Sequence, residues 1–103
     1  MTGFRILPVA AARLDEIYNY TRDTWGADQA ERYVRSLFDT FSAIAVRDVL
    51  WKPIPAEMGI YGWFCRHEHH FIYWRELDDV CIGIATVLHE RMHRVMRLKE
   101  AFG

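Results

Sequence analysis

The sequence predicts one α+β domain in which a helical hairpin packs on one face of a small, mainly antiparallel sheet. Two observations lead to this fold. Apolar residues recur at i, i+3, i+4 spacing between positions 10 and 45, and short apolar runs alternate with two tight polar turns between positions 60 and 88. The 103 residues suit a single domain over positions 1–103, and 51% hydrophobic residues exclude a disordered chain. The expected element order is β-α-α-β-β-β-α.

The first half of the chain contains one strand and two helices. A strand over residues 4–7 ends at Pro8, which suits the first turn of a helix. Gly26 separates the two helices, and the carboxylate of Asp28 is expected to cap the second one. The apolar stripes are Leu14, Ile17, Tyr18, Thr21 and Trp25 on the first helix, and Ala30, Tyr33, Val34, Leu37, Phe38, Phe41, Ile44 and Ala45 on the second.

The second half contains three strands and a last helix, after a proline-containing loop from Val49 to Gly59. The strands are expected at Ile60–Cys65, Phe71–Arg75 and Val80–Leu88, with turns at residues 67–70 and 77–79. On the last strand the small side chains share one face, which would let the hairpin approach closely; they are Cys81, Gly83, Ala85 and Val87. The last helix carries a narrow apolar stripe of Met92, Val95 and Met96, flanked by Arg91, Arg94 and Arg97.

Charge gives no general indication of nucleic-acid binding. The formal net charge is −1, from 13 basic and 14 acidic residues, so we expect no direct binding of duplex DNA by this chain alone. The basic residues are mostly arginine, whose planar fork suits carboxylates and phosphates. The arginines near the C-terminus are therefore expected to meet an acidic polypeptide, unless they simply keep a terminal helix in solvent.

Cysteine usage and hydropathy favour a cytoplasmic protein. Cys65 and Cys81 lie in predicted strands, and two cysteines make no disulfide framework. No secretory signal precedes Pro8, and the apolar runs are too short to span a membrane.

Six segments of the chain form an ordered pattern: Phe4–Leu7, Ala11 with Leu14–Ile17, Trp25-Gly26, Ala30–Tyr33, Phe71–Arg75 and Ile84–Met92. Taken in this order, they resemble the RelE/ParE superfamily of bacterial toxins from type II toxin–antitoxin modules. The segment Val87-Leu88-His89-Glu90-Arg91-Met92 is most similar to the ParE branch. The resemblance implies the fold deduced above and a toxin that poisons DNA gyrase without enzymatic turnover. It also implies neutralisation by a ParD-type antitoxin whose disordered tail folds around the toxin in a hetero-oligomer, with no cofactor and no membrane.

The RelE and YoeB branches suggest an alternative, a ribosome-dependent mRNA endoribonuclease. Its base, acid and phosphate-binding cations would be Glu57, Arg66, Arg75 and His89. Against it, the chain has only two lysines, and Glu90-Arg91 stands where such toxins carry a terminal aromatic residue. A structural interpretation is also open, in which Arg75 pairs with a carboxylate near the following turn and His89 caps the last helix. A third interpretation is an inactive homologue that serves only as an antitoxin partner.

A histidine cluster at residues 67–70 raises the question of a metal site. His67 and His69 are two residues apart and would share a strand face, with Glu68, His70 and Cys65 nearby. Turn residues of this type are typically solvated, so we expect no metal.

The antitoxin is expected to bind the face of the sheet that the hairpin leaves open, because an uncovered apolar face marks an interface. Ile72, Trp74, Met92 and Met96 would line this groove, and Arg91 and Arg94 would meet the acidic tail. The sequence does not indicate which surface contacts gyrase.

Overall fold

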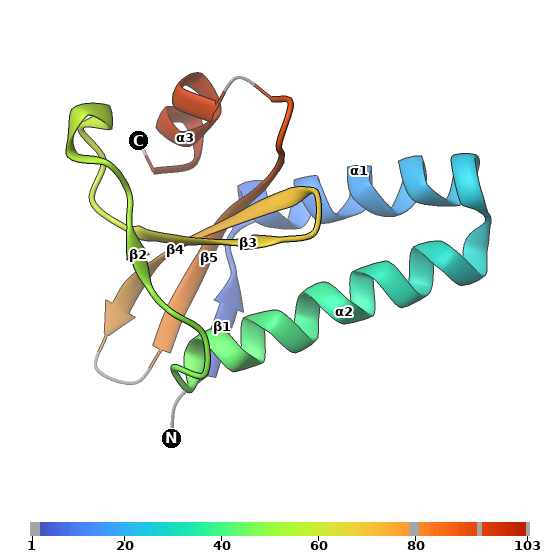
Figure 1. Ribbon diagram of the computed structural model, residues 1–103, viewed down its shortest axis with the longest axis horizontal. Helices are drawn as coiled ribbons and strands as arrows, with labels where there is room; N and C mark the ends of the chain where they lie inside the picture. Colours follow the sequence, from blue (N-terminus) through green and yellow to red (C-terminus); the bar gives the residue numbers. More distant parts are fainter. Residues whose placement is uncertain (1–2, 79–80, 93, 103) are drawn as a thin grey trace.

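The computed structural model describes residues 3–78, 81–92 and 94–102, and it confirms the predicted α+β fold (Figure 1). Its elements are β1 (Gly3–Ile6), α1 (Pro8–Trp25), α2 (Ala27–Ala45), β2 (Lys52–Pro53), η1 (Ala56–Met58), β3 (Trp63–His67), β4 (His70–Asp78), β5 (Cys81–His89) and α3 (Arg94–Phe102). The strand order is β1-β5-β4-β3-β2, and the β1–β5 pair alone is parallel among these pairs. The predicted loop thus contains a two-residue strand and a 3₁₀ turn. Asp79 and Val80, predicted at a turn and a strand start, lie outside the described residues.

The helical hairpin forms largely as predicted, with a different cap. Pro8 occupies the first turn of α1, where its missing N–H costs nothing. Gly26, at φ 101°, takes a backbone conformation that suits glycine and serves as the N-cap of α2. The prediction that Asp28 caps this helix is wrong, because Asp28 lies within the first turn and makes no capping hydrogen bond there. Its charge still favours the positive end of the helix dipole.

The main core lies between the hairpin and one face of the sheet. Leu37, Phe41 and Ile44 of α2 are fully buried there. The sheet contributes Ile72 and Trp74 from β4, also fully buried, together with Ile82, Ile84 and Val87 from β5. The prediction that Ile72 and Trp74 lie on an open face is therefore wrong, because both pack beneath the hairpin.

A β-bulge in β5 explains why simple alternation misassigns the faces. Tyr73 pairs with Thr86, but Trp74 pairs with Ile84, so Ala85 is an extra residue in β5. The bulge reverses the alternation, and Ile84 and Val87 consequently share the hairpin face although they are three residues apart. The predicted small-residue face is wrong for this reason.

The opposite face of the sheet has its own apolar cluster and is covered in part by α3. Leu98 of α3 is fully buried against Tyr73 and Leu88, with Phe64 and Phe71 packed around them. Of the apolar stripe predicted for the last helix, only Met92 packs against this cluster, whereas Val95 is 39% and Met96 60% exposed. Leu98 and Phe102 supply the contacts expected from that stripe.

A row of polar contacts, here called the polar seam, joins α2 to the turn between β3 and β4. The Tyr33 hydroxyl lies 2.6 Å from Nδ1 of His70, and the Ser36 and Thr40 hydroxyls each lie 3.0 Å from a ring nitrogen of His67. Burial, together with the neighbouring His89, His67 and His69, lowers the pKa of His70 to about 4. Burial and the charge of Glu68 raise the pKa of Tyr33 to about 12. At neutral pH the phenol therefore donates and the neutral imidazole accepts.

The polar seam predicts acid sensitivity that His70→Asn should reduce. The pKa of His70 is lower in the folded state than its ordinary value of 6.5, so between about pH 6.5 and pH 4 the unfolded chain takes up a proton that the folded chain refuses. The stability from neutral His70 is present above that window and is lost as pH falls through it. Urea unfolding from about pH 7 to pH 4 should show the wild type losing roughly 1–2 kcal/mol more than the variant. Parallel stability curves would contradict the account.

Candidate binding groove

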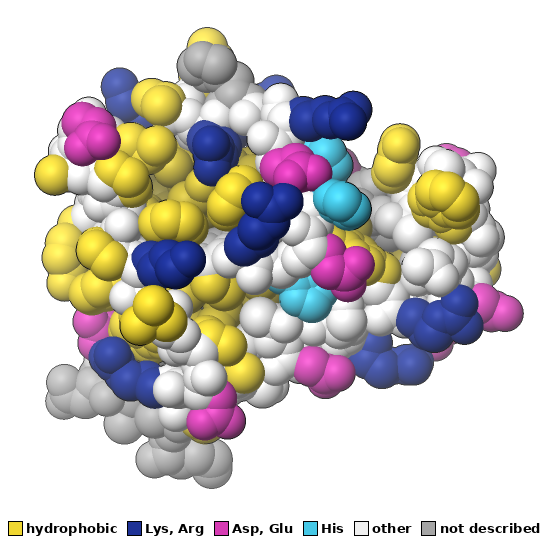
Figure 2. All heavy atoms as spheres, in the orientation of Figure 1, with side chains coloured by type: hydrophobic (Ala, Val, Ile, Leu, Met, Phe, Trp, Pro, Cys, Tyr) yellow, Lys and Arg dark blue, Asp and Glu magenta, His cyan; other side chains and the backbone are white. Residues whose placement is uncertain are grey.

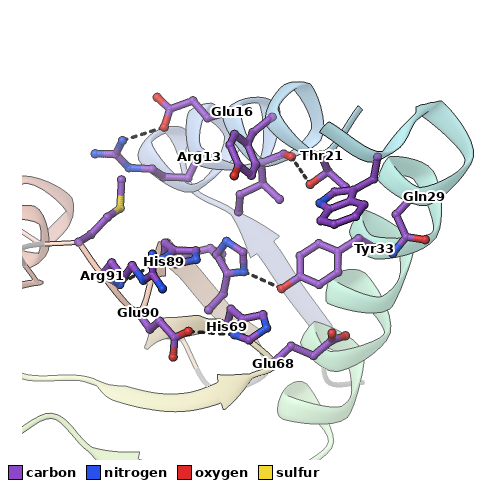
Figure 3. A pocket seen from close by; sticks show the side chains of 16 residues that line it. Arg13, Glu16, Thr21, Gln29, Tyr33, Glu68, His69, His89, Glu90 and Arg91 are labelled. Atoms are coloured by element: carbon purple, nitrogen blue, oxygen red, sulfur yellow. Dashed lines mark hydrogen bonds and ion pairs between the residues drawn. The ribbon is translucent and has the colours of Figure 1, made fainter. Parts of the chain in front are cut away.

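A groove of about 800 Å³ runs between the helical hairpin and the end of the sheet where β4 begins and β5 ends (Figure 3). We call it the hairpin groove. Its lining residues are Arg13, Glu16, Ile17, Tyr20, Thr21 and Trp25 from α1, Gln29 and Tyr33 from α2, Glu68, His69 and His70 around the β3–β4 turn, and Val87 with His89–Met92 from β5 and the segment after it. The walls come from segments far apart in the sequence, so the groove exists only in the folded chain.

Exposed aromatic side chains lie at the outer end of the hairpin groove. Figure 1 shows the connected end of α1 and α2 projecting beyond the strands, where no sheet covers it. Tyr20 and Trp25 are consequently 70% and 71% exposed. The apolar stripe predicted for the first helix is therefore not buried at Trp25. Large aromatic groups left in solvent on a groove wall favour a partner that would bury them.

The opposite wall of the groove is formed by histidines and a glutamate. The ring centroids of His70 and His89 are 5.2 Å apart, and the two rings are nearly perpendicular. The ring centroids of His69 and His89 are 6.4 Å apart, and these rings are stacked. His69 Nδ1 lies 2.9 Å from Glu90, whose other carboxylate oxygen accepts a hydrogen bond from Arg66 at 2.5 Å. The hydrogen bond to His69, aided by Arg66, lowers the pKa of Glu90. Glu90 is thus a carboxylate that already has its partners.

Two of the three carboxylates that line the groove pair with an arginine, and the third, Glu68, approaches only a histidine. Glu16 pairs with Arg13 at 2.9 Å, Glu68 approaches His67 at 3.7 Å, and Glu90 is held as described. Arg91 is exposed, and within residues 3–78, 81–92 and 94–102 its guanidinium has no ion-pair partner, although its backbone N–H donates to Nδ1 of His89. The groove therefore presents apolar surface with a free positive charge at the sheet end.

The candidate ribonuclease residues are divided between the two faces of the sheet. His89 lies on the hairpin face, beside His70, which contacts Tyr33. Arg66 and Arg75 alternate with residues of that face and lie on the opposite one, where Arg66 sits over the Phe71 ring. Glu57 is exposed in η1. The arrangement brings no base together with the two arginines across one scissile bond.

The structural roles expected for two of these residues were an ion pair for Arg75 and a helix cap for His89. Glu76, the carboxylate next to Arg75 in the sequence, approaches Arg47 at 4.0 Å, and Arg75 has no ion pair in the described part of the chain. α3 begins at Arg94, and His89 accepts a hydrogen bond from the backbone N–H of Arg91 in the turn before that helix.

The histidines at residues 67–70 are held by separate partners. His67 contacts Ser36 and Thr40, His70 contacts Tyr33, and His69 contacts Glu90. Across the positions that the structure describes, no group of three or more His, Cys, Asp or Glu side chains is placed to hold a metal ion. The described helices likewise include none that is long and apolar enough to span a bilayer.

The proposed antitoxin-binding residues do not form one surface. Arg91 and Met92 line the hairpin groove, whereas Arg94 packs over the Phe71 ring on the other face, 4.6 Å from its centroid. Met96 is exposed on α3, and Ile72 and Trp74 are buried. Sequence reasoning missed Tyr20 as a groove residue, because no local pattern reveals that the hairpin extends past the sheet.

Comparisons with known proteins agree with this fold. The family described as "ParE toxin of type II toxin-antitoxin system, parDE" matches residues 4–94. Toxin ParE of Escherichia coli is 30% identical over 100 residues, covering 97% of this chain and 96% of that protein. Toxin ParE1 of Mycobacterium tuberculosis is 32% identical over 89 residues, covering 86% and 90%, and Toxin ParE1 of Caulobacter vibrioides is 31% identical over 93 residues, covering 90% and 94%.

A solved structure titled "Chromosomal ParDE TA system from P. aeruginosa" superposes with a TM-score of 0.66 and covers 86% of this chain and 96% of that one. Its sequence identity is 18%, so this likeness supports the fold alone. The family match and the relatives establish more: the chain belongs to the ParE toxin family of type II toxin–antitoxin systems.

Proposed function

We propose that this chain is a toxin that acts by binding DNA gyrase and that a ParD-type antitoxin neutralises it by occupying the hairpin groove. Membership of the ParE family supports gyrase as the target, since gyrase inhibition is the role of that family. A cytoplasmic location follows from this target.

The observation that carries the antitoxin part is the composition of the hairpin groove. It combines exposed aromatic rings at one end with the free guanidinium of Arg91 at the other. An amphipathic segment with an apolar stripe and one acidic side chain would complement both features, in the way that helices bind apolar grooves. Burying an aromatic side chain such as Trp25 or Tyr20 contributes about 1.5–3 kcal/mol, so these two residues would dominate the affinity.

Action by binding is better supported than ribonuclease action. A general base must lie within hydrogen-bond reach of the proton that it abstracts. His89 and Arg75 lie on opposite faces of a five-stranded sheet, and the guanidinium of Arg66 is occupied by Glu90, so one substrate would not contact all three without a rearrangement. An inactive homologue would keep the groove but lack effect on gyrase, and the experiment below separates these cases.

Purified toxin added to gyrase and relaxed plasmid should reduce ATP-dependent supercoiling in a dose-dependent way. If the toxin holds gyrase on broken DNA, linear plasmid should accumulate after detergent and protease treatment. The cognate antitoxin, added first, should restore supercoiling. The binding account is wrong if gyrase activity is unchanged while ribosome-bound mRNA is cut, and an inactive homologue is indicated if neither activity changes.

Replacing the exposed aromatic pair of the groove, Tyr20→Ala with Trp25→Ala, should weaken antitoxin binding by at least about 30-fold, equivalent to about 2 kcal/mol. Both side chains are mostly in solvent, so the fold should not change. Isothermal titration calorimetry with the antitoxin measures the effect. Arg91→Glu should weaken the same complex, whereas Arg94→Glu, on the other face, should not.

The matched control for this pair is Leu50→Ala with Tyr61→Ala. These two residues are 72% and 78% exposed and do not line the groove. Their replacement should leave the antitoxin affinity within about twofold of wild type. Equal losses in the two double variants would refute the groove as the antitoxin site.

A further inference from the structure

The sheet face opposite the hairpin carries a group of basic side chains that we call the basic face: Arg5, Lys52, Arg66, Arg75 and Arg94. Strand pairing places the first four. Arg5 in β1 and Arg75 in β4 both pair with Gly83, from the two sides of β5. Lys52 pairs with Phe64, and Arg66 with Phe71, whose rings belong to the apolar cluster beneath α3. Directly paired residues share a face, so these cations point away from the hairpin.

Most of these charges are not neutralised. Arg5, Lys52 and Arg75 are exposed, and none of them forms an ion pair within the described positions. Arg94 lies over the Phe71 ring rather than beside a carboxylate. Arg66 shares Glu90 with His69. The hairpin differs, because three of its four arginines, Arg13, Arg22 and Arg35, pair with carboxylates, and the fourth, Arg32, donates a hydrogen bond to Gln29.

Figure 2 shows several Lys and Arg side chains spread among hydrophobic ones over the sheet side of this view. The net charge of −1 does not reveal this, since it sums over the whole molecule. The expectation that the chain does not bind duplex DNA was based on this net charge. The fold instead concentrates unpaired cations on one face, and local charge is what governs electrostatic binding.

The geometry points to this face as a binding surface for the phosphodiester backbone of DNA, within the DNA-bound gyrase complex that the proposed function assumes. From Arg5 on β1 to Lys52 on β2 there are four strand spacings, about 19 Å, and from the Arg66 row to the Arg75 row there are four residues, about 14 Å. Duplex DNA carries one negative charge per about 1.7 Å of its axis, so a surface of this width meets several phosphates.

An acidic polypeptide is the less suitable occupant. A peptide bound tightly to a sheet face needs apolar anchoring positions as well as charge. On this face Leu98 and its neighbours already bury Tyr73 and Leu88. The apolar side chains that stay partly exposed, such as Phe64 and Phe71, are interspersed with cations, and Arg66 and Arg94 lie over the Phe71 ring. The apolar recognition surface lies in the hairpin groove on the other side of the sheet. Sequence-independent contact with phosphates requires cations alone.

The test compares two triple variants with the same charge change. Arg5→Gln/Lys52→Gln/Arg75→Gln removes cations from the basic face, and Arg22→Gln/Arg32→Gln/Arg35→Gln removes exposed arginines from the hairpin. Fluorescence anisotropy with a labelled duplex of about 20 base pairs, at several salt concentrations, measures binding. The basic-face variant should bind at least about tenfold more weakly, and its slope of log affinity against log salt should fall by roughly 2–3. The hairpin variant should match wild type within about twofold.

Antitoxin titration and gyrase assays complete the test. Unchanged antitoxin affinity in the basic-face variant would confirm that it is folded and that the two surfaces are separate. The inference is overturned if the wild-type protein fails to bind the duplex at low salt, or if both triple variants lose affinity for the duplex equally. It is also overturned if the basic-face variant loses affinity for the antitoxin but keeps its affinity for the duplex. Wild type that binds DNA but leaves gyrase unaffected would refute the proposed function while the DNA-binding face stands.

Discussion

The central strands of this protein are apolar on both faces, and this constraint determines the architecture. On β4, Ile72 and Trp74 require cover on one side, and Tyr73 requires it on the other. The hairpin covers the first side and α3 covers the second, so the helices cannot share one layer. Burial of these side chains is the main stabilising term, at roughly 25 cal/mol per Å² of apolar surface. The sheet between the two layers keeps their outer surfaces apart.

Local patterns in the sequence determine the elements, and these were predictable. The helical spacing from Leu14 to Ile44 and the two polar turns gave the element order and the fold, because these signals depend on near neighbours. The sheet face on which each β5 side chain lies was not predictable. The bulge at Ala85 reverses the alternation of side chains between the two faces, and it arises from the pairing of β5 with β4. Local patterns also do not predict that Trp25 is exposed or that His89 and Arg75 lie on opposite faces of the sheet. Both features depend on how the elements pack in the folded chain.

The two outer surfaces of the molecule have different chemistry. The hairpin groove offers aromatic rings, carboxylates and an arginine that has no ion-pair partner among the described residues, which suits a polypeptide with an apolar stripe. The basic face offers cations, most of them without an ion pair among the described residues, above a cluster that α3 covers in part, which suits phosphates. Under the proposed function the toxin meets both an antitoxin and a DNA-bound enzyme, and this separation would let each partner bind its own surface. Neutralisation would then act by steric exclusion or by altering the sheet, because the antitoxin would not need to cover the basic face itself.

The central claim is that the sheet separates two independent binding surfaces. Amide chemical-shift mapping of isotope-labelled protein, titrated separately with antitoxin and with a short duplex, tests it most directly. The account predicts that antitoxin perturbs residues around Tyr20, Trp25 and Arg91, and that the duplex perturbs residues around Arg5, Lys52 and Arg75. Overlapping sets of perturbed residues would contradict it, as would antitoxin-induced changes centred on Tyr73 and Leu88.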